Sequence, residues 1–290
     1  MCCPYKLEQF RNTEAFFIKK YYNELGVEEF EVLETFDAHT CEICSAMDGK
    51  HFSKSQYEIG VTVPPFHPRC RGTTIPYFAD MEGYGERAAR DLDGNTFYVP
   101  SDTTYEQWKQ MQDAKYGVGS VDKTRKMEYN KSVDLKLYDK YKQILGNNAP
   151  KSFKEFQNIK YDDSLYSMFK GYANSIKTGE LTPLADFELY KDISNEIDSK
   201  LVGIITSNGI KITGKSKHFI ARTIGSVEQR RNGVSVDRSL DVLTNNNATV
   251  FNVRENANGR SQKFRYNDVE ITINPDTGIL IQVNPWKKVR

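Results

Sequence analysis

Four residues between positions 41 and 70 have the types and the spacing of a metal site. Cys41 and Cys44 form a C-x2-C pair, and His67 and Cys70 form an H-x2-C pair. Zinc prefers four thiolate or imidazole ligands in a tetrahedron, and two ligands separated by two residues can bind one ion from a tight turn. Because the protein fills all four positions, no position is left for a reactive water. We therefore expect a structural zinc ion rather than a catalytic one.

Each of these pairs is a weak signal when it stands alone, because it could arise by chance. Cys41 and Cys44 could also form a redox pair, but the chain around Cys41 does not resemble the helix start of a βαβ unit. Prolines stiffen the second turn, and Asp48-Gly49 offers a chain reversal between the two pairs. The two pairs can therefore meet around one ion.

A second group of residues has the side-chain types that cleave RNA without a metal. That reaction needs a base, an acid and cations that face the phosphate. His218 and Arg222 stand four residues apart, so they share one face of a helix that Ser216 can cap. We predict that both are catalytic and that the adjacent Lys217 binds nucleic acid. The alternative is a partly buried, hydrogen-bonded histidine with no role in chemistry.

Strands expected after residue 249 could bring further polar residues to this helix. Apolar and polar residues alternate in four segments, separated by turns rich in Asn and Gly: 250–254, 262–266, 269–274 and 279–284. Thr272 and Asn274 share one sheet face because the strand period is two. We predict that Lys263, Thr272 and Asn274 are catalytic and that Arg265 binds nucleic acid. For Lys263 and Arg265 the alternative is a solvated sheet face.

The elements that must position these residues form an α+β protein. We expect the last part of a helical region and a zinc knuckle at 1–80, a linker at 81–132, a helical spacer at 133–199, and a domain at 200–290. In that last domain, helices starting at Ser216 and Ser235 should pack on one face of an antiparallel sheet. Residues 200–290 should therefore be separable from the rest of the chain.

Composition and charge limit the classes of function. The content of 38% hydrophobic and 27% charged residues is typical of a globular protein, and no apolar segment is long enough to cross a membrane. The net charge of +1 hides an asymmetry, because residues 201–290 contain 14 Lys and Arg but only 7 Asp and Glu. Either a polyanion partner such as RNA or a solvated basic face explains that excess. Five cysteines do not form a secreted disulfide framework in a chain of this size, so we expect reduced thiols in the cytoplasm.

The cysteine module resembles a known family. Residues 33–44 (LETFDAHTCEIC), 47–52 (MDGKHF) and 64–74 (PPFHPRCRGTT) resemble the C-terminal end of Mu-type phage minor head proteins, also called head-morphogenesis proteins. The resemblance covers about residues 10–80. It implies a minor virion component that contacts the portal or other head proteins in the host cytoplasm and in the virion. That family has a long helical region before this point, so we expect a truncated prophage gene or a fragment.

The C-terminal part has a second resemblance. Residues 215–222 (KSKHFIAR), 260–264 (RSQKF) and 273–278 (INPDTG) resemble phage-borne nuclease-like domains grouped with barnase, colicin D and RelE toxins. This resemblance implies a ribonuclease-like effector carried behind the minor head domain. Two other hypotheses stay open: a module that binds nucleic acid or a head protein without cleavage, and a polymorphic toxin unrelated to virions.

Overall fold

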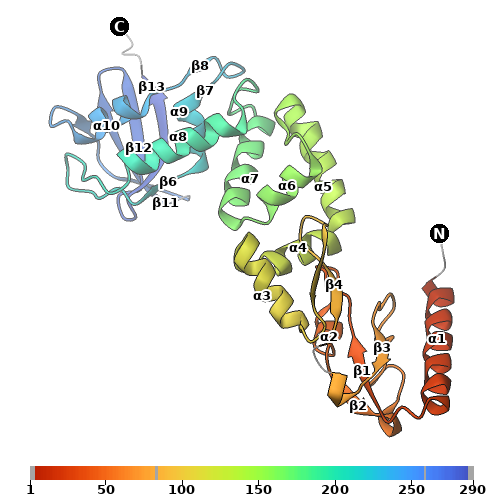
Figure 1. The fold of residues 1–290 in the computed structure, drawn as a ribbon. Coiled ribbons are helices and arrows are strands. Elements are labelled where there is room, and N and C mark those ends of the chain that lie inside the picture. Colours follow the sequence, from red (N-terminus) through yellow and green to blue (C-terminus); the bar gives the residue numbers. More distant parts are fainter. Residues whose placement is uncertain (1–3, 82–83, 258, 287–290) are drawn as a thin grey trace. The chain divides into compact units, whose positions relative to one another are not determined.

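The chain forms two compact units with a boundary between Lys131 and Ser132. The computed structural model describes residues 4–81, 84–257 and 259–286. Helices account for 43% and strands for 21% of the chain, and the sheets are antiparallel or mixed (Figure 1). The predicted α+β class is therefore confirmed. Each unit has its own hydrophobic core, and the units are described one at a time.

A three-stranded antiparallel sheet organises the start of the first unit. Helix α1 (Pro4–Glu24) places Ala15 and Tyr22 in a core with Phe30 of that sheet. The Tyr22 hydroxyl donates a hydrogen bond to Thr74, which ties the helix to the third strand. The strands are, in spatial order, β2 (His51–Ser53), β1 (Glu29–Leu33) and β3 (Thr73–Pro76).

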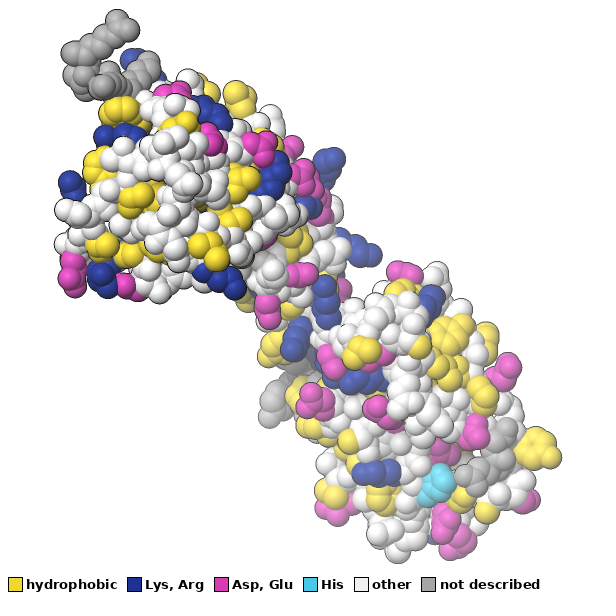
Figure 2. Space-filling view, turned by 90° about the vertical axis from the view of Figure 1, so that its left-hand side faces the viewer, with side chains coloured by type: hydrophobic (Ala, Val, Ile, Leu, Met, Phe, Trp, Pro, Cys, Tyr) yellow, Lys and Arg dark blue, Asp and Glu magenta, His cyan; other side chains and the backbone are white. Residues whose placement is uncertain are grey.

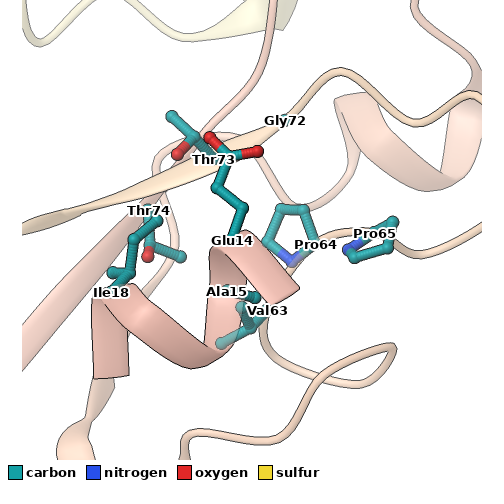
Figure 3. A pocket seen from close by; sticks show the side chains of 9 residues that line it. All are labelled: Glu14, Ala15, Ile18, Val63, Pro64, Pro65, Gly72, Thr73 and Thr74. Carbon is teal, nitrogen blue, oxygen red and sulfur yellow. The ribbon is translucent and has the colours of Figure 1, made fainter. Parts of the chain in front are cut away.

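A small cavity lies between α1 and β3. Figure 3 shows Glu14 and Ile18 of α1 beside Thr73 and Thr74, with Pro64 on the other side. Its volume of about 20 Å³ has room for one water molecule at most. This cavity is therefore a gap in the packing and not a substrate site.

The segment predicted as a linker is folded, which corrects the expected boundary at residue 80. It consists of the hairpin strands β4 (Glu86–Arg90) and β5 (Thr96–Pro100), followed by helices α3 (Tyr105–Tyr116) and α4 (Ser120–Tyr129). Trp108 is completely buried and stacks on Phe36, which precedes the cysteine module. The polar, Gly-rich sequence of this segment reflects its hairpin turns and exposed helix faces. Both strands and both helices of the segment contribute buried residues to one cluster with Phe36.

The second unit begins with four helices. Side chains of Ser152, Asp162 and Asp186 accept hydrogen bonds from the backbone of the first turns of α6, α7 and α8, which fixes where these helices start. The helices are α5 (Lys131–Leu145), α6 (Phe153–Lys160), α7 (Asp163–Lys177) and α8 (Phe187–Lys200).

A sheet follows these helices in the second unit. Figure 1 shows helices α9 (Lys217–Ile224) and α10 (Val236–Thr244) beside its strands. All pairings in this sheet are antiparallel except the one between β13 and β6 (Gly214–Lys215). The other strands are β9 (Thr249–Val250), β10 (Arg254–Asn256), β11 (Gly259–Tyr266), β12 (Val269–Ile273) and β13 (Ile279–Pro285).

The helices of 133–199 and the sheet share one core, which corrects the predicted division at residue 200. Buried Phe169, Tyr190 and Ile197 belong to the same apolar cluster as Phe219 and Ile271. The apolar faces of these helices, which were expected to pack on neighbouring parts of the chain, form one continuous core with the sheet. The unit that folds around this core is therefore 132–290.

Charged side chains of both signs lie on the face of the chain seen in Figure 2. Four basic side chains after residue 200 pair with acidic side chains of the same segment: Arg238 with Asp268, Arg260 with Asp276, and Lys263 and Arg265 with Glu270. These pairs fix the positions of single charges but do not reduce the net positive charge of the segment. Among the residues that the structure describes, no helix is both long enough and apolar enough to cross a membrane.

Candidate functional site

The four predicted metal ligands converge in the first unit. Cys41 caps the short helix α2 (Glu42–Ser45), which contains Cys44, and the other two ligands lie in the loop before β3. The His67 Nε2 atom lies 3.1 Å from Sγ of both Cys41 and Cys44, and Sγ of Cys44 lies 3.6 Å from Sγ of Cys70. Nδ1 of His67 lies 2.8 Å from the Pro68 carbonyl oxygen. If Nδ1 carries the ring proton and donates it to this carbonyl, the lone pair of Nε2 is available to bind a metal ion. This cluster could bind a metal ion.

A buried carboxyl adjoins the cluster. Glu34, Cys44 and Cys70 form a second group whose possible ligand atoms all lie within 4.8 Å of one another. Burial, and then the charge of Cys70, raises the pKa of Glu34 to about 8. The hydrogen bond between the two thiols lowers the pKa of Cys70 to about 5 and raises the pKa of Cys44. Cys70 is therefore the thiol of this pair that ionises first, and the thiolate is the form that binds a borderline-soft metal ion.

His218 and Arg222 lie on one face of α9, as the spacing predicted. Ser216 fixes the start of this helix, because its hydroxyl accepts a hydrogen bond from the Phe219 N–H at 3.0 Å. The same hydroxyl donates to the Ile281 carbonyl at 2.6 Å, which attaches the helix to β13. His218 and Arg222 therefore have fixed positions beside β13.

A glutamate that the sequence did not reveal joins these two residues. Glu180 lies in the turn after α7, and one of its carboxylate oxygens contacts Nδ1 of His218. The same oxygen lies 3.6 Å from Nε of Arg222. The Glu180 side chain is 16% exposed, while that of His218 is 38% exposed and open to solvent. A carboxylate in contact with Nδ1 orients the ring and leaves Nε2 to react with a substrate.

Further donors lie near Glu180 and bond to main-chain carbonyl groups. Arg231 donates from Nη2 to the Glu180 carbonyl at 2.6 Å and from Nη1 to the Arg222 carbonyl at 3.2 Å. Among the described residues, four polar atoms of this region are buried and have no hydrogen-bond partner: Nε of Arg222, Nε of Arg231, the hydroxyl of Tyr190 and Oε1 of Glu180. Donors buried without partners are costly, and the negative charge of Glu180 offsets part of that cost. We call Glu180, His218, Arg222, Arg231 and Tyr190 the α9 cluster.

The electrostatics of the α9 cluster favour a neutral imidazole. Burial lowers the pKa of His218 below its ordinary value of 6.5, and the positive charge of Arg222 acts in the same direction. Glu180 and a hydrogen bond with Gln282 oppose this shift without reversing it. A neutral imidazole near pH 7 can accept a proton.

The predicted sheet residues Lys263, Arg265 and Thr272 lie on the polar face of the sheet. Lys263 is paired with Thr272 and Arg265 with Glu270 across the antiparallel strands. Lys263 donates to Glu270 at 2.7 Å, and Arg265 donates to its other carboxylate oxygen. Although burial acts in the opposite direction, these two bonds hold the pKa of Glu270 below its ordinary value. Thr272 is buried next to this pair.

Asn274 does not belong to the site, which corrects its predicted catalytic role. Its side-chain oxygen accepts hydrogen bonds from the backbone N–H groups of Asp276 and Thr277 at 2.9 and 3.0 Å. Asn274 therefore holds the turn between β12 and β13. Lys217 is exposed at the start of α9, and its aliphatic stem lies against Gly171 of α7.

Some of the residues that lie near His218 and Arg222 could have been predicted from the sequence, and others could not. The alternation of residues 279–284 could have placed Gln282 and Asn284 on the face of Thr272, since the strand itself was predicted. Glu180 lies in the turn after α7 and Arg231 in the short strand β8 (Arg231–Asn232), and no spacing in the sequence relates either residue to His218. Comparisons with protein families, with curated proteins and with solved structures found no match for this chain.

Proposed function

We propose that the unit 132–290 is a ribonuclease that cleaves RNA without a metal ion. The observation that carries this proposal is the α9 cluster, in which an imidazole oriented by Glu180 lies beside two arginines. Cleavage of this type needs a group that moves a proton and cations that stabilise the charge on the phosphate. His218 supplies the first requirement, and Arg222 and Arg231 supply the second.

The proposed reaction is an internal transesterification. His218 accepts the proton of the ribose 2′-hydroxyl at Nε2, because Nδ1 faces Glu180. The 2′-oxygen then forms a bond to phosphorus, and the bond from phosphorus to the 5′-oxygen breaks. The leaving 5′-oxygen takes a proton from solvent. The products are a 2′,3′-cyclic phosphate and a 5′-hydroxyl end, while Arg222 and Arg231 hold the equatorial oxygens of the phosphate.

Cleavage of total RNA in the presence of a chelator tests this proposal. We expect fragments that end in a 2′,3′-cyclic phosphate, and we expect His218→Ala to slow their release by roughly 10²- to 10⁴-fold. His39→Ala is the matched control, because His39 is exposed in the first unit and far from the α9 cluster in sequence. Tight RNA binding by the wild type without fragments would show a binding module instead of an enzyme.

We also propose that the first unit carries a structural zinc ion and belongs to a minor head component of a tailed phage or prophage. The convergence of Cys41, Cys44, His67 and Cys70 supports the zinc ion. The virion role rests on the resemblance of residues 33–74 to phage minor head proteins. Mass spectrometry of purified virions tests that role, with the portal or other head proteins as expected partners. Absence of the chain from virions would contradict it and would favour a free toxin.

A further inference from the structure

The polar face of the sheet in the second unit connects the α9 cluster with a group of aromatic residues. Phe264, Ile271 and Val283 of three neighbouring strands point into the core. Because side chains alternate along a strand, the residues on either side of them point to the opposite face. The strand register aligns two rows there: Lys263–Thr272–Gln282 and Arg265–Glu270–Asn284.

Both rows end at the proposed catalytic helix. The Gln282 side chain is close enough to His218 to act on its pKa, and Arg222 donates from Nη1 to the Asn284 side chain. Thr272, in the middle of one row, is 5% exposed, and its hydroxyl has no hydrogen-bond partner among the described residues. The polar sheet face is therefore continuous with the α9 cluster.

Two aromatic rings flank the other end of the second row. The guanidinium of Arg265 lies 4.7 Å from the centre of the Phe251 ring and 4.2 Å from that of the Trp286 ring. Both aromatic side chains are partly exposed. Trp286 lies two residues after Asn284, which corresponds to about 7 Å along an extended chain. Arg265 and Asn284 are two strand spacings apart, roughly 10 Å, so the aromatic group of Phe251, Arg265 and Trp286 lies within about one nucleotide length of the residue that Arg222 contacts.

We propose that the aromatic group binds the base of a nucleotide next to the scissile phosphate of single-stranded RNA. Every base has a flat apolar face that stacks on an indole or phenyl ring, and an arginine held against the rings adds a cation–π contribution. A base must leave its helix to stack in this way, so the preferred substrate is a single strand or a loop. This inference rests on the proposed ribonuclease function and adds the substrate class.

The intrinsic fluorescence of the chain offers a direct test, because it has two tryptophans and Trp108 is completely buried. In a Trp108→Phe variant, Trp286 is the one remaining tryptophan. We expect a single-stranded DNA oligonucleotide, which cannot be cleaved through a 2′-hydroxyl, to quench this fluorescence by stacking. An abasic oligonucleotide with the same number of phosphates should quench much less.

Affinity of the variants gives an independent measurement. Trp286→Ala should weaken binding of the same oligonucleotide by roughly 5- to 150-fold, while Trp286→Phe should recover most of it. Tyr98→Ala is the control, because Tyr98 is a 67% exposed aromatic residue in the first unit. Equal quenching by the intact and the abasic strand, or unchanged affinity in Trp286→Ala, would overturn the base-binding role.

The two proposals can fail separately. Base-dependent quenching without RNA cleavage would support the aromatic group and refute the ribonuclease. Cleavage with an unchanged KM in Trp286→Ala, together with no quenching, would refute the aromatic group and keep the ribonuclease. Thermal melting of each variant distinguishes lost binding from lost folding, and the Trp108→Phe experiment keeps Trp286 itself in place.

Discussion

Replacing Glu180 by glutamine keeps the shape of the side chain but removes the charge that His218 and Arg222 share. Their side chains are 38% and 22% exposed, and that of Glu180 is 16% exposed. Breaking a buried ion pair typically costs about 3–5 kcal/mol, and solvent screening reduces this for partly exposed partners. We expect the free energy of unfolding of Glu180→Gln to fall by about 1–3 kcal/mol, measured by urea denaturation.

The same variant should change the titration of His218. The Glu180 carboxylate acts to raise the pKa of His218, so its removal should lower a pKa that already lies below 6.5. A histidine with a depressed pKa contributes stability above its unfolded-state pKa, and that stability is lost as the pH falls through its folded-state pKa. The stability deficit of Glu180→Gln should therefore be constant at neutral and higher pH and grow as the pH falls below 6.5, where imidazoles with different folded-state pKa values bind different numbers of protons. NMR titration of the imidazole measures the pKa directly.

Glu188→Gln is the matched control for this experiment. Glu188 lies in the first turn of α8 with a 70% exposed side chain and pairs with Lys191 three residues later. Its loss should change the free energy of unfolding by less than about 0.5 kcal/mol. Equal stability of the two variants, or an unchanged or raised pKa of His218 in Glu180→Gln, would refute the assigned role of Glu180.

Three further changes test other parts of the structure. Trp108→Ala should destabilise the first unit by about 3–5 kcal/mol in thermal or urea unfolding, because the ring is completely buried. A loss of stability below about 1 kcal/mol would restore the interpretation of this segment as a linker. Asn274→Ala should lower the free energy of unfolding by about 1 kcal/mol, because its turn hydrogen bonds are lost, but it should leave the rate of RNA cleavage unchanged. A large fall in the cleavage rate would show that Asn274 takes part in catalysis after all. Elemental analysis should find about one zinc ion per wild-type chain and much less zinc in Cys44→Ser. Removal of the metal by a chelator should lower the melting temperature of the wild type, and absence of metal from the wild type would refute the site.

The features that the sequence predicted depend on neighbours in the chain. The alternation of residues 262–266, 269–274 and 279–284 matched β11, β12 and β13 to within a few residues, because a half-buried sheet imposes its period locally. The spacing of His218 and Arg222, and of each metal-ligand pair, is also a local property. These predictions therefore needed no knowledge of the whole fold.

The features that the sequence did not predict depend on distant contacts. Trp108 packs on Phe36, more than seventy residues earlier, so residues 86–131 read in isolation resemble a polar linker. Glu180 reaches His218 only because α7 and α9 pack in the same core. Asn274 shares the period of Thr272, but the turn that follows it captures its side chain.

The shared core of residues 132–290 has a consequence for how this chain could exchange parts with other genes. A recombination breakpoint near residue 200 would separate Phe169 and Tyr190 from the sheet that buries them, and it would also remove Glu180 from His218. A breakpoint near residue 131 would preserve both the packing and the α9 cluster. The segment that natural shuffling could transfer as an intact folding unit therefore includes the four helices before the sheet.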